Sequence, residues 1–205
     1  MLKSVTQKSD GLFKDRGSKF IASLHPVRSD EEADQILQSV KKEHPQATHH
    51  CYAWRIDPEN IREFSQDDGE PSGTAGLPIL NAMRSANLIN CMIIVVRYYG
   101  GTNLGKGGLI QAYGASAAES IENARLKSVQ LTTHFRITYK YEQQNLIDKW
   151  KNLFEFTEKE ADYAEQVTLL LGCSDDKAPD FKKTIEANRH LLEAAEETGK
   201  GFDFV

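Results

Sequence analysis

The sequence predicts an α+β protein built from two domains, and three observations support this prediction. Stretches in which every second residue is apolar, typical of half-buried strands, alternate with stretches of helical spacing. Nine of the fourteen glycines lie between Gly69 and Gly114, and none follows until Gly172. Residues 1–130 carry 15 basic and 15 acidic side chains, whereas residues 131–205 carry 10 and 15. We therefore expect one domain over 1–130 and another over 131–205.

Composition and cysteine usage are typical of a cytoplasmic protein. Of the 205 residues, 40% are hydrophobic and 27% are charged, as in ordinary globular domains. Cys51, Cys91 and Cys173 have no C-x-x-C spacing, which favours reduced thiols. The N-terminus lacks the apolar stretch of a secretory signal, and the longest apolar run, Cys91 to Val96, is too short to cross a bilayer. We expect cytoplasmic localisation and no membrane partner.

The net charge of −5 comes entirely from the second domain. A net-acidic half is not typical of a nonspecific polyanion binder. If nucleic acid is the partner, the first domain must therefore carry a local basic patch that the net charge conceals.

The first domain begins with a predicted strand, helix and strand. Apolar residues alternate over 18–27, as in a half-buried strand. An S-x-x-E capping box opens the helix predicted over 29–44, and Pro45 ends it. Alternation returns over 48–56. The polar residues 57–76 are predicted to form a long loop, which at this length is usually functional or mobile.

The glycine-rich middle of the chain predicts a helix, a strand, a glycine loop and a second helix. Residues 77–88 can form a short helix that starts at Pro78, and Cys91 to Tyr99 is predicted to be a buried central strand. After the loop 100–108, apolar or small residues recur at helical spacing and would let a helix lie close to a sheet. These residues are Leu109, Ala112, Tyr113, Ser116, Ala117, Ser120 and Ile121.

The second domain has the predicted order βαββαβ, the split βαβ arrangement of ferredoxin-like domains. The last strand, after His190, is the weakest element, because "LLEAAEE" is as compatible with a helix as with a strand. The other predicted elements are strand 131–141, helix 145–153, strand 155–164, strand 166–172 and helix 178–188.

The segment "GGTNLGKGG" (100–108) is the first candidate for a binding site. It matches the G-x-x-x-x-G-K of a phosphate-binding P-loop, but Gly107 stands where that loop needs the Ser or Thr hydroxyl that binds Mg²⁺. A G-x-G-x-x-G starting at Gly105 would need glycine at Ile110, so a dinucleotide fingerprint is excluded. Glycines before a helix can still present backbone N–H groups to an anion. The alternative is that they only allow a tight turn and close packing.

The segment "DDGEPSGTAGLP" (67–78) is the second candidate. Its three carboxylates, Asp67, Asp68 and Glu70, could ligate a hard cation or supply a general acid or base. The alternative is a surface turn whose short polar residues cap their own backbone. The spacing of a calcium-binding EF-hand is absent. We expect no metal and no cofactor.

Two further features carry charge or nucleophilic groups. Arg97 ends a strand that should be buried, so its guanidinium needs a partner, either one of the three carboxylates or a ligand phosphate; the ion pair is favoured. In "HHCYAW", His49 and Cys51 would face one side of a strand and His50 the other, so the three cannot jointly hold Zn²⁺ without distortion. A nucleophilic enzyme would need the fold to bring His50 to Ser72, Thr74 or Cys91.

The motifs "ATHHCYAWRI", "DDGEPSGTAGLPIL" and "VVRYYGGTNLGKGGLIQAYGASAA" resemble, in this order, the signature of the IMPACT family, in its bacterial YigZ-like branch. They span about residues 47 to 118, and the sequence departs from the usual pattern at Asn103 and Lys106. The resemblance implies a ribosomal protein S5 domain 2-like N-terminal domain followed by a ferredoxin-like domain. This pair is similar to the fourth and fifth domains of elongation factor G, which implies binding to RNA or the ribosome.

The eukaryotic relatives restrain the signalling that activates a translation-initiation-factor kinase, and they carry an additional N-terminal RWD-type domain. We expect no counterpart of that domain in this sequence, so the kinase-related role is not expected to extend to it. The superfamily also includes small-molecule kinases whose glycine-rich loop holds phosphates, and residues 105–118 resemble that loop weakly.

The leading hypothesis is a non-catalytic protein that associates with RNA or the ribosome and acts in regulation of translation, with a possible protein partner in that process. Backbone N–H groups of the glycine loop, together with two cations, would contact phosphate. These binding residues are Arg97, Gly100, Gly101, Gly105, Lys106, Gly107 and Gly108. The adjoining wall would comprise His50, Asp67, Asp68, Glu70, Ser72, Gly73 and Thr74. The competing hypothesis is an enzyme that acts on a phosphorylated or nucleotide-like small molecule at the same loop. One of the three carboxylates would be the base or an Mg²⁺ ligand, and His50 would lie nearby. No catalytic residue is assigned.

Overall fold

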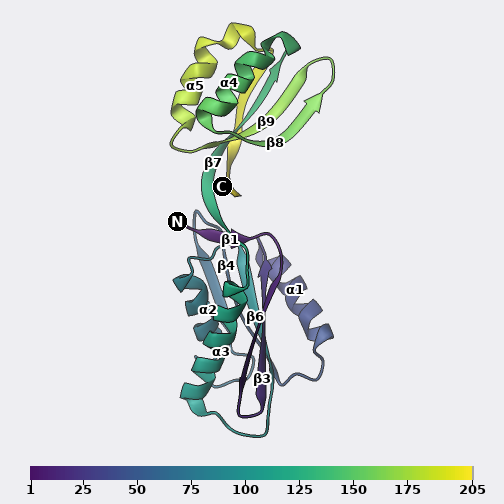
Figure 1. The fold of residues 1–205 in the computed structure, drawn as a ribbon, viewed down its shortest axis with the longest axis vertical. Helices are drawn as coiled ribbons and strands as arrows, with labels where there is room; N and C mark the ends of the chain where they lie inside the picture. Colours follow the sequence, from purple (N-terminus) through teal and green to yellow (C-terminus); the bar gives the residue numbers. More distant parts are fainter. Residues whose placement is uncertain (205) are drawn as a thin grey trace. The chain divides into compact units, whose positions relative to one another are not determined.

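The computed structural model describes residues 1–204, and the chain divides into two compact units, Met1–Ser128 and Val129–Val205 (Figure 1). Unit 1 contains a five-stranded sheet with the order β2-β3-β6-β4-β5, and unit 2 contains a second sheet. Helices and strands mix in both units, which confirms the predicted α+β class. No helix among residues 1–204 has the length and apolar character needed to cross a bilayer.

Unit 1 is an antiparallel sheet covered by helices on both faces (Figure 1). Apolar side chains of α1 pack on one face, and those of α2 and α3 pack on the other. The elements are β1 (Lys3–Val5), β2 (Ser9–Asp15), β3 (Ser18–Pro26), α1 (Asp30–Glu43), β4 (His49–Ile56), β5 (Arg62–Gln66), α2 (Gly76–Ser85), β6 (Cys91–Tyr98) and α3 (Gly105–Glu122).

Strand β6 lies in the middle of this sheet and is buried on both faces. Ile93 and Val95 pack toward α2 and α3, whereas Ile94 and Val96 pack toward α1. A strand covered on both faces needs apolar residues at successive positions instead of alternate ones. The uninterrupted run "CMIIVV" follows from this burial, and the prediction of a buried central strand is confirmed.

The two longest helices of unit 1 follow the sequence signals. At the start of α1 the Ser29 hydroxyl accepts a hydrogen bond from the N–H of Glu32 (3.2 Å), and the Glu32 carboxylate accepts one from the N–H of Arg28 (2.7 Å). These bonds satisfy donors that a helix start leaves unpaired. In α3, all seven residues of the predicted stripe are buried.

The structure differs from the sequence predictions in three places. Residues 57–76 are not one long loop, because they contain the edge strand β5. Most residues of this strand are polar, so the sequence shows no clear apolar alternation. Phe64 of β5 stacks on Trp54, with 5.7 Å between the ring centroids. Strands β1 and β2 were not predicted, because few of their side chains are buried apolar ones. Helix α3 begins at Gly105, so the last glycines of the predicted loop form the first turn of the helix.

Unit 2 is an antiparallel ferredoxin-like sheet with the strand order β10-β7-β9-β8. Two helices pack on one face, and the ring of Phe181 contacts Phe135, Trp150 and Phe154 in the core. The ambiguous segment after His190 contributes the strand β10. The elements are β7 (Leu126–Tyr139), α4 (Gln144–Phe154), β8 (Thr157–Tyr163), β9 (Val167–Ser174), α5 (Ala178–Ala187) and β10 (Ala194–Phe204).

Candidate functional site

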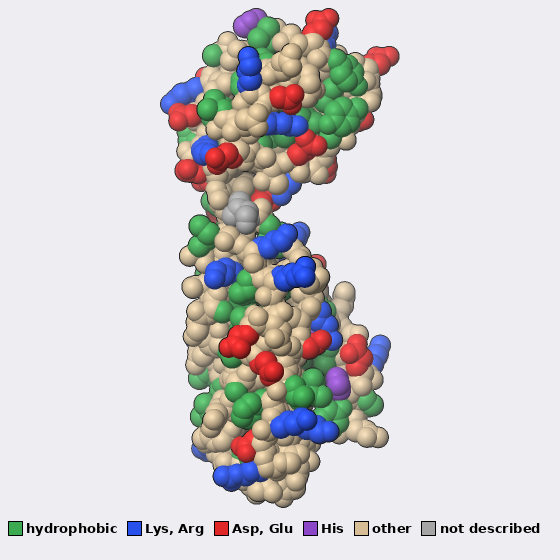
Figure 2. Space-filling model, in the orientation of Figure 1, with side chains coloured by type: hydrophobic (Ala, Val, Ile, Leu, Met, Phe, Trp, Pro, Cys, Tyr) green, Lys and Arg blue, Asp and Glu red, His purple; other side chains and the backbone are tan. Residues whose placement is uncertain are grey.

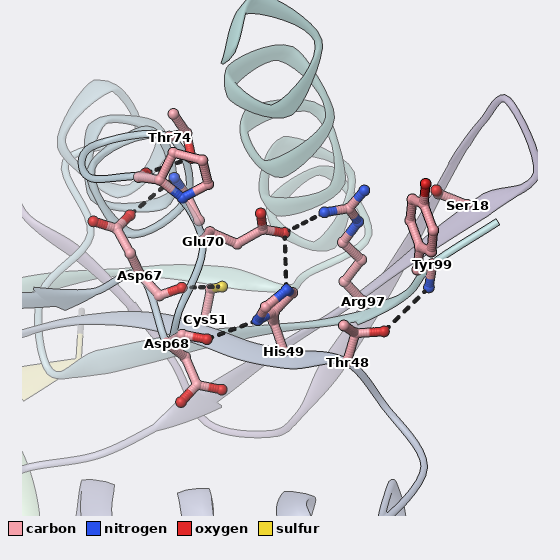
Figure 3. A network of polar contacts seen from close by, with 12 residues as sticks. Ser18, Thr48, His49, Cys51, Asp67, Asp68, Glu70, Thr74, Arg97 and Tyr99 are labelled. Atoms are coloured by element: carbon pink, nitrogen blue, oxygen red, sulfur yellow. Dashed lines mark hydrogen bonds and ion pairs between the residues drawn. The ribbon is translucent and has the colours of Figure 1, made fainter. Parts of the chain in front are cut away.

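A buried ion pair lies between the two motifs of unit 1. Arg97, near the end of β6, donates from Nη1 to Glu70 Oε1 at 2.5 Å, and both side chains are more than nine-tenths buried. The hydroxyl of Tyr113, in α3, donates to the same carboxylate oxygen at 2.8 Å. Figure 3 shows the guanidinium of Arg97 pointing toward the carboxylate of Glu70. The prediction that a carboxylate of the 67–78 segment pairs with Arg97 is confirmed.

His49 and Cys51 extend this network along β4. His49 Nδ1 lies 2.7 Å from the carbonyl oxygen of Asp68, and its Nε2 lies 3.8 Å from Glu70 Oε1. The thiol of Cys51 lies within hydrogen-bonding distance of the Tyr113 hydroxyl (3.3 Å). Burial raises the pKa of the Cys51 thiol and the pKa of the Tyr113 phenol. Both groups therefore stay protonated, and Cys51 is not an activated nucleophile.

His50 lies on the opposite face of the sheet, as the alternation in β4 requires. Its Nε2 lies 3.2 Å from the carbonyl oxygen of His44, and its backbone N–H donates to the carboxylate of Asp68 (2.7 Å). Desolvation by burial lowers the pKa of His50. The structure gives His50 no contact with Ser72, Thr74 or Cys91, so the nucleophile pairing that an enzyme would need does not form among the described residues.

Asp67 holds the start of α2. Its carboxylate accepts hydrogen bonds from the N–H groups of Gly73 (2.8 Å), Ala75 (3.0 Å) and Gly76 (2.8 Å). A carboxylate that accepts three backbone hydrogen bonds at the positive end of a helix stabilises the start of that helix strongly. The oxygens of Asp67 are therefore engaged by the protein.

Replacing Asp67 by asparagine should lower the free energy of unfolding of unit 1 by about 1–2 kcal/mol, because an amide cannot accept all three bonds and loses its charge at the helix start. Hydrogen exchange followed by mass spectrometry should show faster exchange over the first turn of α2. The neighbouring Ser72→Ala, at an exposed side chain, is the control and should leave exchange unchanged. Equal protection of α2 in both variants would contradict this role of Asp67.

The other polar residues of the 67–78 segment shape the turn. Asp68 has a positive φ of 44°, Gly73 has one of 74°, and the Thr74 hydroxyl donates to the carbonyl of Pro71 (2.6 Å). All three carboxylates of this segment have protein partners, which supports a turn that bonds its own backbone over a general base or Mg²⁺ ligand. Glu70 and Thr74 are buried, so the turn is not wholly a surface one. No group of three or more His, Cys, Asp and Glu side chains within residues 1–204 is arranged to hold a metal ion.

The glycine loop lies against the turn of the β2–β3 hairpin. The N–H of Gly100 donates to the buried hydroxyl of Ser18 (3.1 Å). A Cβ on Gly100 would lie 2.0 Å from the backbone carbon of Gly17, so the two backbones are in direct contact. Gly101 and Gly105 have positive φ values of 84° and 70°. Four glycines are therefore required where the hairpin meets the glycine loop, either because the backbones approach closely (Gly17 and Gly100) or because φ is positive (Gly101 and Gly105).

The N-cap residue of helix α3 lies in this loop and is Leu104, whose side chain makes no capping hydrogen bond. The first turn of the helix contains no acidic residue. Lys106, Gly107 and Gly108 form that first turn, and the side chain of Lys106 is exposed. A Cβ on Gly107 would meet no atom within 4 Å, so neither packing nor conformation explains this glycine.

The hairpin turn adds cations that the sequence reasoning missed. Lys14 and Lys19 are direct partners across β2 and β3, and Lys19 also pairs with Tyr98 of β6. Arg16 occupies the turn with a positive φ of 43°. In Figure 2, Lys and Arg side chains lie beside hydrophobic ones at this end of unit 1, at the bottom of the view. The run "KDRGSK" was the available signal, but only the contact between Gly17 and Gly100 relates it to the glycine loop.

The fold and the glycine loop together define a class of two-domain proteins. One domain is an antiparallel sheet covered by helices, and its central strand leads through a glycine-rich turn into a helix. The other domain is ferredoxin-like. Residues 16–121 match the model of the Impact N-terminal domain. The chain is 37% identical to the IMPACT family member YvyE of Bacillus subtilis, over 73% of this chain and 69% of that protein. It is 32% identical to YigZ of Escherichia coli over 80% and 81% of the two chains.

A crystal structure of a hypothetical protein superposes with a TM-score of 0.61 at 29% identity and covers 94% of this chain and 95% of that one. The chain belongs to the IMPACT family, and it is similar to the YigZ-like members over most of its length. This agrees with the resemblance seen in the three sequence motifs.

Proposed function

We propose that this protein binds RNA, free or in the ribosome, through the end of unit 1 that carries the glycine loop, and that it acts in cytoplasmic regulation of translation. The observation that supports the site best is the uncapped start of α3 beside a group of cations. An anion at a helix N-terminus gains roughly 0.3–1 kcal/mol, and each lysine or arginine that contacts a phosphate adds an electrostatic contribution.

The balance of charge at this end favours a polyanion. The two segments that meet here, 14–19 and 98–108, contain four cations and one carboxylate, Asp15. None of the cations (Lys14, Arg16, Lys19 and Lys106) forms an ion pair with a carboxylate among residues 1–204. These four cations are our candidate for the local basic patch that the acidic net charge conceals, and they support phosphate as the ligand group.

The role in translation rests on the family. The sequence motifs that place the chain in the IMPACT family imply a pair of domains similar to those of an elongation factor, and the ferredoxin-like unit 2 agrees with that pairing. The engagement of Asp67, Asp68 and Glu70 inside the fold favours binding over catalysis at this loop.

Lys106→Glu should weaken binding to a fluorescein-labelled RNA oligonucleotide and to purified ribosomes. Because one phosphate contact is lost, the log-log salt dependence of RNA binding should become shallower by about 0.7. Fluorescence anisotropy and ribosome co-sedimentation at several salt concentrations give these values. Lys149→Glu, an equal charge change at an exposed position of α4 in unit 2, is the matched control. The proposal fails if the wild-type protein binds no RNA at low salt, or if both variants bind alike.

A further inference from the structure

Tyr99, the residue between β6 and the glycine loop, is an exposed aromatic side chain held in a fixed position. Its side chain is 46% exposed. Its hydroxyl donates to the side-chain oxygen of Asn103 (3.2 Å), and its backbone N–H donates to the hydroxyl of Thr48 (3.4 Å). A ring that is already oriented loses little conformational entropy when another ring stacks on it.

A buried guanidinium supports one side of this ring. The Arg97 guanidinium carbon lies 5.4 Å from the centroid of Tyr99 and 5.4 Å from that of Phe20. Glu70 fixes the guanidinium from the side, as Figure 3 shows. Tyr99 is therefore the outermost member of a column of Phe20, Arg97 and Tyr99. Arg97 lies over one face of the Tyr99 ring, so a base would have to stack on the other face.

Two lysines of the hairpin stand in an arrangement that is unfavourable without a ligand, and one of them, Lys19, lines the same pocket as Tyr99. Lys14 and Lys19 are directly opposite each other on the hairpin, and like charges in that position are destabilising. Arg16 adopts a left-handed conformation at a turn position that favours glycine or asparagine. A polyanion bound at this place would relieve the repulsion between the two lysines.

Tyr99 and Lys19 line the same pocket, which has a volume of about 420 Å³. It is lined by Gly17, Lys19, Ile21, Tyr98 and Tyr99, and its volume lies within the range of small-ligand sites, about 300–1,000 Å³. Apolar and aromatic atoms line it together with one lysine. This combination suits a base and its phosphate better than a phosphate alone.

We propose that Tyr99 is a base-stacking platform and that the RNA bound at this end of unit 1 is single-stranded, with Lys19 and its hairpin neighbours on the phosphates. This inference rests on the proposed function and adds the strandedness of the ligand and the residue that receives a base. A base inside a duplex has both faces covered by its neighbours, whereas a single-stranded base can stack on an aromatic side chain.

The test compares Tyr99→Leu, Tyr99→Phe and Tyr99→Trp with the wild-type chain, using labelled single-stranded oligo(A) and a fully paired RNA duplex of the same length. Tyr99→Leu should weaken single-strand binding about 5-fold to 100-fold, the range of one stacked base, without changing the salt dependence. The phenylalanine and tryptophan variants should retain affinity. Lys19→Gln should instead make the salt dependence shallower by about 0.7.

Tyr163→Leu is the matched control, because Tyr163 is a tyrosine of unit 2 that is 60% exposed. This variant should bind both RNAs as the wild-type chain does. Urea unfolding of each variant separates lost stacking from lost folding. The inference is overturned if Tyr99→Leu binds oligo(A) as tightly as wild type, or if the duplex binds as tightly as the single strand; either result leaves the proposed function standing. Absence of binding to both RNAs at low salt overturns the proposed function itself.

Discussion

Glu70→Gln should lower the free energy of unfolding of unit 1 by about 3–5 kcal/mol. The substitution keeps the size of the side chain but leaves the guanidinium of Arg97 buried without a countercharge. Glu70 is the carboxylate paired with this guanidinium, and within residues 1–204 the Nε of Arg97 has no hydrogen-bond partner. Since small domains have total stabilities of about 5–15 kcal/mol, a loss of this size should be obvious in urea unfolding of the full chain.

The double variant Glu70→Leu with Arg97→Met tests whether the loss of stability comes from an uncompensated buried charge or from the lost ion pair itself. If the destabilisation comes from an uncompensated buried charge, removing both charges should restore much of the stability, because apolar pairs often replace buried ion pairs at little cost. Glu122→Gln, at the exposed last residue of α3, is the control and should stay within about 0.5 kcal/mol of wild type. A change below about 1 kcal/mol for Glu70→Gln would show that the pair is dispensable to the fold.

The parts of the fold that the sequence predicted are those in which burial dictates residue type. The alternation in β3 and β4, the apolar run of β6 and the stripe of α3 each follow from contact with a core. Strands β2 and β5 were missed because they lie at the edges of the sheet and expose most of their side chains. Edge strands carry the weakest hydrophobic pattern, so local sequence cannot distinguish them from loops.

At the candidate site, local chemistry was predictable and long-range pairing only partly so. Because Arg97 was predicted to lie in a buried strand, it needed a partner, and the sequence offered three carboxylates for this role. The structure shows that the partner is Glu70. The sequence left open whether the short polar residues of 67–78 cap their own backbone, and it could not single out Asp67, because its contact with the N–H of Ala75 closes a turn over residues 67–75. The hairpin cations were missed for another reason: only tertiary contact brings 14–19 next to the glycine loop.

Gly100→Ala should destabilise unit 1 by about 3 kcal/mol, the upper part of the range for forced overpacking. The new Cβ would lie 2.0 Å from the backbone carbon of Gly17 and 2.3 Å from the backbone nitrogen of Ser18. Neither atom belongs to a side chain that could rotate away, so the hairpin and the loop must separate. Thermal or urea unfolding measures the stability, and hydrogen exchange should show the loss of protection centred on 15–19 and 98–103.

Gly107→Ala is the matched control within the same motif. Its Cβ would meet no atom within 4 Å and its φ is not positive, so stability should stay the same or rise by up to about 1 kcal/mol from the better helix propensity of alanine. Equal destabilisation in the two variants would contradict the assignment of close packing to Gly100 alone. If Gly107→Ala folds normally and still loses RNA affinity, the missing side chain at 107 serves the approach of a ligand to α3. The same motif would then contain glycines required by the fold and one required by binding.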